Sequence, residues 1–174
     1  MSLIVEDGTG LADAQSYVSA VDADAYFLAR ANSVWAAATP EAKEAALVRA
    51  TQALDGDHFV RGGYWPGWRA TEAQALDWPR THAWDVDRYP LVDCVPRGVK
   101  NATCEAALVE LSSAGILLES LERGGALVSK KIGTIEKTWS AKAPVRTIYP
   151  TIRQALARVC LPCGQVQSAR VIRA

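Results

Sequence analysis

Apolar residues recur at steps of three and four residues in the first part of the chain, the spacing of one face of an α-helix. Val21, Ala25 and Leu28 follow this pattern. Ser19 and Asp22 stand at the spacing of a capping box, with Asp in place of the usual Glu. We therefore predict a helix of about three turns that begins after Ser19.

A second helix has stronger start signals. Thr39 suits an N-cap, Pro40 the first helical position and Glu41 the positive end of the helix dipole. Gly56 stands where a C-cap is expected. The residues predicted to form the buried stripe of this helix are Leu47, Ala50 and Leu54.

Glycine and proline interrupt every possible long element between residues 62 and 96. This stretch predicts a long loop with a short helical turn at residues 70–78. Helical spacing returns at Pro96 and continues to Leu121. We expect that stretch to be the longest helix and the central one.

Residues 122–139 mix isolated apolar residues with Lys, Thr and Ser, which predicts extended strands or a hairpin. Pro150 begins a last short helix, and we expect residues 165–174 to follow as an arm that binds a partner. The predicted fold is mainly α, a small helical bundle with a long central loop. Its parts are a helical core domain (residues 1–128), a β hairpin or extended segment (residues 129–149), and a C-terminal helix with a basic docking arm (residues 150–174).

Composition and charge narrow the function classes. With 174 residues, 49% hydrophobic and 22% charged, the chain suits one folded domain rather than a disordered protein. The N-terminal residues lack the features of a secretory signal, and no apolar run is long enough for a bilayer. We expect a protein made in the cytoplasm, with no membrane partner and with its cysteines reduced.

The charges are unevenly distributed, although the formal net charge is zero. Residues 129–174 hold nine Lys or Arg and one acid, so they carry +8 and residues 1–128 carry −8. This asymmetry indicates that the C-terminal part contacts an acidic surface, a nucleic acid or the body of a neighbouring copy.

The sequence contains no recognisable catalytic set. His82 lies near Asp77 and Asp85, but the chain has no nucleophile elbow, no HExxH motif and no phosphate-binding glycine loop. Cys160 and Cys163 form a CxxC motif at a helix end, a context that disfavours a redox or zinc role. We expect no enzyme activity, no cofactor and no metal.

The long loop alternates tryptophan with arginine, the composition of a surface that stacks unpaired bases and neutralises phosphates. These residues are Trp65, Trp68, Trp78 and Trp84, with Arg61, Arg69, Arg80 and Arg88. Tryptophan can instead anchor a loop by packing. Nearby aspartates cancel the arginine charges, so we favour packing or protein contact over a phosphate groove.

Several segments resemble, in order and spacing, small proteins of tailed-phage and prophage head-assembly clusters. They are DGTGLADAQSYVS, TPEAKEAALVRATQALD, QALDWPRT, VPRGVKNATCEAAL and TIYPTIRQAL. The resemblance covers nearly the whole chain, and GGYWPGW and CLPCG depart from the family pattern. Such proteins are often labelled DnaT-like single-stranded-DNA-binding proteins, yet they look like head-tail connector adaptors.

The resemblance implies a structural virion protein, made in the host cytoplasm, that forms a ring of about twelve copies below the portal and links capsid to tail. Its implied partners are further copies of itself, the portal protein, the next neck or tail-completion protein and the packaged DNA in the lumen. The alternative is a single-stranded-DNA-binding protein of DnaT-like type.

These considerations give three sets of candidate residues. The portal-docking set, in the C-terminal helix and arm, is Ile152, Arg153, Leu156, Arg158, Val159, Val166, Arg170, Val171, Ile172 and Arg173. The structural turn is Leu76, Asp77, Trp78, Pro79 and Arg80, in which we expect Leu76 and Trp78 to be buried and Arg80 to hold Asp77 or a loop carbonyl. The DNA-facing set is Lys130, Lys131, Lys137 and Lys142.

Overall fold

The computed structural model describes residues 3–91, 94–118, 129–132, 135–138 and 147–162. The helices are α1 (Ala20–Leu28), α2 (Ser33–Ala36), α3 (Pro40–Gly56), α4 (His58–Arg61), α5 (Arg97–Ser112), the 3-10 turn η1 (Ile116–Leu118) and α6 (Pro150–Leu156). The strands are β1 (Gly63–Tyr64), β2 (Trp68–Arg69), β3 (Arg80–Thr81), β4 (Ser129–Ile132), β5 (Ile135–Thr138) and β6 (Leu161–Pro162). The fold class is mainly α, as the sequence predicts.

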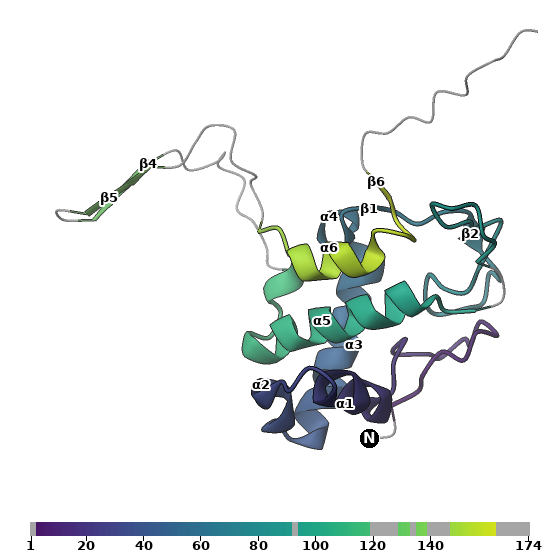
Figure 1. The fold of residues 1–174 in the computed structure, drawn as a ribbon, viewed down its shortest axis with the longest axis horizontal. Coiled ribbons are helices and arrows are strands. Elements are labelled where there is room, and N and C mark those ends of the chain that lie inside the picture. The colour runs from purple at the N-terminus through teal and green to yellow at the C-terminus, as the bar shows by residue number, and fades with distance from the viewer. Residues whose placement is uncertain (1–2, 92–93, 119–128, 133–134, 139–146, 163–174) are drawn as a thin grey trace, which may run out of the picture.

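The helical core consists of α3, α5 and α6, and α5 contacts both of the others. Figure 1 shows α1 and α2 at one end of this core and the long loop between α4 and α5 at the other. The central position expected for the helix that begins after Pro96 is therefore confirmed. Among the described residues, no helix has both the length and the apolar character needed to span a bilayer.

The predicted starts of the first two long helices are confirmed. Ser19 caps α1, because its side chain accepts a hydrogen bond from the Asp22 N–H and donates one to the Asp22 carboxylate. Thr39 caps α3 by accepting from the Ala42 N–H at 3.3 Å, with Pro40 at the first helical position. The predicted stripe residues Leu47, Ala50 and Leu54 are fully buried.

The prediction that one helix runs from Pro96 to Leu121 is wrong, because α5 ends at Ser112. The buried Glu110 carboxylate accepts hydrogen bonds from the backbone N–H groups of Gly115 (2.6 Å) and Leu117 (3.0 Å). These bonds stabilise a turn in place of further helix. At 17 residues α3 is longer than α5, which has 16.

The C-terminal helix also differs from its predicted grouping. The sequence prediction places it with the docking arm, but α6 packs on α5, and Ile152 and Leu156 are fully buried. It therefore belongs to the same core as the preceding helices. The predicted hairpin is confirmed: β4 and β5 pair antiparallel, with Ser129 opposite Thr138 and Ile132 opposite Ile135.

Candidate functional site

Among the described residues, the loop between α4 and α5 carries the exposed aromatic side chains. It is held to the core by Tyr17 and Asp55, which we call the frame. Asp55, near the end of α3, accepts hydrogen bonds from the Tyr17 hydroxyl (2.7 Å) and the Asp77 N–H (3.0 Å). The Tyr17 hydroxyl accepts from the Trp78 N–H at 3.1 Å. These bonds fasten the QALDWPR turn to the helical core.

Burial of this frame changes the ionisation of both acids in it. Removal from water raises the pKa of Asp55 to about 7, against the opposing effect of its hydrogen bonds from Tyr17 and Asp77. Burial, followed by the charge of Asp55, also raises the pKa of Tyr17 well above its usual range. The folded chain therefore favours the protonated form of Asp55 more than the unfolded chain does.

The turn itself has the predicted form. Leu76 is 8% exposed and Trp78 is fully buried, and the Trp78–Pro79 peptide is cis. The expected role of Arg80 is confirmed, because its guanidinium donates to the backbone carbonyl of Asp77 at 3.1 Å. It also donates at 2.7 Å to two other loop carbonyls, those of Pro66 and Gly67.

The helical turn predicted at residues 70–78 does not form. The buried side chain of Gln74 donates to the carbonyl oxygens of Leu76 (2.7 Å) and Pro79 (3.0 Å). Its amide oxygen accepts from the Thr71 N–H at 2.8 Å. This side chain satisfies backbone groups that a helical turn would otherwise pair.

Arg61 braces the start of the loop in the same way as Arg80. Its guanidinium donates to three backbone carbonyl oxygens, those of Leu54 (2.6 Å), Asp55 (3.0 Å) and Gly63 (2.9 Å). Arg61 and Arg80 are each 9% exposed. The donors in these bonds are thus committed to the chain itself, and two of the four arginines of the Trp–Arg pattern have a structural role.

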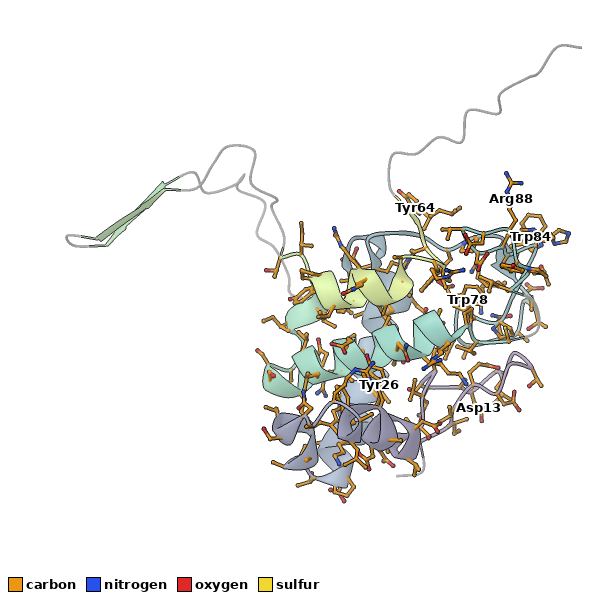
Figure 2. All side chains as sticks on the ribbon, in the orientation of Figure 1. Asp13, Tyr26, Tyr64, Trp78, Trp84 and Arg88 are labelled. Atoms are coloured by element: carbon orange, nitrogen blue, oxygen red, sulfur yellow. The ribbon has the colours of Figure 1, made fainter. Side chains whose placement is uncertain are left out.

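The four tryptophans of this loop also fall into a buried pair and an exposed pair. Trp65 and Trp78 are 7% and 0% exposed and pack edge to face, with ring centroids 5.8 Å apart. Trp68 and Trp84 are 60% and 51% exposed. Figure 2 shows Trp78 inside the molecule and Trp84 at its outer edge. Trp65 and Trp78 therefore anchor the loop by packing, whereas Trp68 and Trp84 are exposed to solvent.

Tyr64 and Trp68 line an open cavity of about 660 Å³, which we call the aromatic cavity. Tyr64 is 53% exposed, and Trp68 stacks on His82 with ring centroids 4.6 Å apart. The exposed Arg69 and Glu72 also line the cavity and have opposite charges. The rest of its lining includes Trp65, Arg61, Arg80 and Asp77, so the cavity combines three aromatic rings with charged groups of nearly balanced sign.

The tight turn of residues 85–89, which we call the finger, also carries exposed side chains. The Asp85 carboxylate accepts from the N–H groups of Asp87 and Tyr89, both at 2.9 Å. Arg158, at the end of α6, pairs with the carboxylates of Asp85 (3.3 Å) and Asp87, and its carbonyl accepts from the Val86 N–H. These bonds fix the turn, and Val86 and Tyr89 remain 55% and 67% exposed.

The structure corrects part of the predicted portal-docking set. Ile152, Leu156 and Val159 are 0%, 0% and 5% exposed because they face α5 in the core, so they are not available to a partner. Arg158 is exposed but braces the finger. Arg153 is half-buried and lies beside Gly62. The remaining members lie outside the described residues: Val166, Arg170, Val171, Ile172 and Arg173.

Of the predicted DNA-facing lysines, Lys130 and Lys137 are cross-strand partners in the β4–β5 hairpin, and Lys131 is opposite Glu136. Lys142 lies outside the described residues. Within the described part of the chain, no group of three or more His, Cys, Asp or Glu side chains could hold a metal ion. Burial raises the pKa of the Cys104 thiol to about 12, which keeps it protonated.

Comparison with known protein families shows to which family the chain belongs. A family model described as "Putative DnaT-like ssDNA binding protein" matches residues 1–174. The chain belongs to this family. No curated protein and no solved structure matches it. The family description agrees with the label expected for such sequences, and the connector role implied by the resemblance stays a prediction.

Sequence reasoning singled out Trp68, Trp84 and the turn but missed Tyr17, Asp55 and Tyr64. The Tyr17–Asp55 bond joins residues 38 positions apart, a distance at which no local pattern gives a signal. Tyr64 lies in the GGYWPGW segment, where its neighbouring glycines and aromatic residues were a usable signal of an exposed turn.

Proposed function

We propose that this chain is a structural protein of the phage neck, a head-tail connector that binds protein partners through its aromatic cavity. One observation carries this proposal. The guanidinium donors of Arg61 and Arg80 are directed to backbone carbonyls, while the rings of Tyr64 and Trp68 are exposed beside them. The loop therefore presents aromatic surface on a rigid support.

Such a surface has the properties of a protein-docking site. Exposed aromatic side chains on a fixed backbone lose little conformational freedom on binding, and they dominate the energetics of protein interfaces. A groove for single-stranded DNA needs cations that can reach phosphates. Here Glu72 offsets Arg69, and the buried arginines make their bonds within the loop.

The partners in this proposal are other copies of the chain, the portal and the next neck or tail-completion protein. Because Ile152, Leu156 and Val159 are buried, docking to the portal in this proposal needs the residues beyond α6 together with the aromatic cavity. Removing residues 165–174 is expected to leave the fold intact, since the core residues in the described part of the chain all precede them, and to abolish attachment to portals. Attachment equal to that of the full chain would contradict this assignment.

Electron microscopy of the purified protein mixed with DNA-filled, tailless heads tests the proposal. We expect a ring of added density under the portal vertex, whose symmetry gives the number of copies. Clean vertices, with the protein bound instead to released DNA, would contradict it.

The second candidate is binding of single-stranded DNA, favoured by the family description and by the pairing of Lys130 with Lys137 across the hairpin. The exposed Trp68–His82 stack is also a surface on which a base can stack. This candidate predicts micromolar or tighter affinity for an oligothymidylate, steeply weakened by salt and lost in a Lys130→Glu/Lys137→Glu variant. Failure to bind at low salt would remove it.

A further inference from the structure

The aromatic cavity contains hydrogen-bond donors that the loop itself does not use. Arg61 is 9% exposed, and its Nε and Nη1 atoms donate to backbone carbonyls. Its Nη2 atom, with two N–H groups, donates to none of the described residues and is still reached by solvent. Because Arg61 lines the cavity, this nitrogen is open to a molecule that fills the cavity.

Trp65 supplies a second unused donor close to the first. The Arg61 guanidinium lies over the Trp65 ring, with its carbon 5.0 Å from the ring centroid. The Trp65 Nε1–H is buried, and in the described part of the chain no acceptor lies within hydrogen-bond distance of it. A buried N–H without an acceptor is destabilising, so this part of the cavity favours a ligand that brings an oxygen atom.

Two exposed rings determine what can accompany that oxygen. Tyr64 and Trp68, which line the same cavity, are 53% and 60% exposed. Rings on a fixed backbone pack well against another aromatic or an apolar side chain. The cavity volume of about 660 Å³ lies within the range of pockets that hold drug-sized ligands, so a few side chains of a peptide fit.

The charges of the lining favour one carboxylate over a run of phosphates. The free edge of the Arg61 guanidinium and a neighbouring N–H suit the two oxygens of a carboxylate. Arg80 uses all three of its side-chain nitrogens to bond loop carbonyls. Glu72 and Asp77 also line the cavity and disfavour a polyanion, whose binding needs several available cations.

We propose that the aromatic cavity binds a short acidic segment of a partner protein. An Asp or Glu carboxylate of that segment accepts hydrogen bonds from Arg61 Nη2 and Trp65 Nε1. An aromatic or apolar side chain next to the carboxylate packs against Tyr64 and Trp68. The inference rests on the proposed protein-docking function and specifies the chemistry of the partner segment.

Two short peptides, capped at both ends, test this chemistry on the full chain. One is acetyl-Gly-Trp-Glu-Trp-Gly-amide, and the other has Gln in place of Glu. Nuclear magnetic resonance of isotope-labelled protein follows the indole N–H signals of Trp65 and Trp68 during titration. We expect the Glu peptide to shift both signals with a Kd of about 1 mM or tighter, and the Gln peptide to bind about tenfold more weakly.

Two matched variants locate the binding site. Trp65→Phe keeps an aromatic ring and removes the N–H, so it is expected to weaken the Glu peptide about fivefold, reported by the Trp68 signal. Trp35→Phe makes the same change in α2, at the other end of the core, and is expected to bind like the parent (Figure 1). If Trp65→Phe does not fold, the comparison of the two peptides on the parent still decides the inference.

Three results would overturn the inference. The first is no shift of the cavity signals by the Glu peptide at about ten times the expected Kd. The second is equal affinity for the Glu and Gln peptides, which would show that the donors do not select a carboxylate. The third is tighter binding of a pentathymidylate than of the Glu peptide at the same signals, which would assign the cavity to nucleic acid.

This experiment contains no phage heads, so its result does not depend on the neck role. Peptides that fail to bind would remove the carboxylate site and leave the microscopy of heads to decide whether the chain is a connector. Clean vertices in the microscopy would leave a positive peptide result unchanged.

Discussion

Trp78 and Trp68 belong to one loop and lie ten positions apart in the sequence, yet one is fully buried and the other is 60% exposed. Trp78 is fastened to the Tyr17–Asp55 frame, whereas Trp68 stacks on His82 beside the aromatic cavity. Likewise, Arg80 is buried and Arg69 is exposed. The comparison teaches that the inner residues hold the loop in shape and that the outer residues are available for contact.

Replacing each tryptophan by alanine gives the largest expected contrast. Trp78→Ala is expected to lower the free energy of unfolding by about 3–5 kcal/mol, because it removes a large ring from the core. Trp68→Ala is expected to change it by less than about 0.5 kcal/mol. Chemical denaturation measures both, with Trp78→Phe as a milder variant if the first does not fold. Equal losses would contradict the division into inner and outer residues.

The pH dependence of stability tests the inner frame itself. The folded state binds the Asp55 proton more tightly than the unfolded state, since its pKa is raised from 3.8 to about 7. The stabilisation is fully present below pH 3.8 and is lost as the pH rises through about 7, so unfolding should become easier by a few kcal/mol over this range.

Denaturation at a series of pH values measures this effect, and Asp55→Asn is the matched variant. The amide keeps the shape of the side chain and cannot ionise, so the fall in stability over this range should become shallower by the contribution of Asp55. Parallel curves for the parent and Asp55→Asn would show that Asp55 is not the group responsible.

The two arginines provide a smaller contrast. Arg80→Met removes hydrogen bonds to three loop carbonyls and is expected to lower the free energy of unfolding by about 1–3 kcal/mol. Arg69→Met, at an exposed position, is expected to change it by less than about 0.5 kcal/mol. Thermal unfolding of the two variants side by side measures the difference, and a larger effect at Arg69 would reverse our assignment.

The smallest expected effect on stability is at the brace of the finger. Arg158 is exposed, so Arg158→Ala is expected to leave the melting temperature nearly unchanged. Loss of the brace is expected to loosen the finger, so amide hydrogen exchange at residues 85–89 should become faster. Unchanged exchange at these residues would show that Arg158 does not hold the turn.

Local patterns predicted the elements whose signals lie within a few residues. The capping residues Ser19 and Thr39, the buried stripe of α3 and the β4–β5 hairpin all follow from such signals. The burial of Leu76 and Trp78 was also predictable from the sequence, because both are large apolar residues beside Pro79, which ends the preceding turn. The bond from Arg80 to the Asp77 carbonyl agrees with the expected role of this arginine.

The wrong predictions have a common physical origin in long-range or side-chain-to-backbone bonds. Glu110 caps the turn after α5, and Gln74 replaces the predicted helical turn, but neither role follows from apolar spacing. The spacing of Val21 and Leu28 predicted a helix and could not say which side of it the core covers.

The most direct test of the central claim compares the parent with a Tyr64→Ala/Trp68→Ala variant, first for thermal stability and then for attachment to tailless heads by electron microscopy. We predict equal melting temperatures, a ring of density at the portal vertex for the parent, and a clean vertex for the variant. A variant that still attaches to heads while losing affinity for oligothymidylate would contradict the account, because the outer aromatic residues would then serve nucleic acid rather than protein.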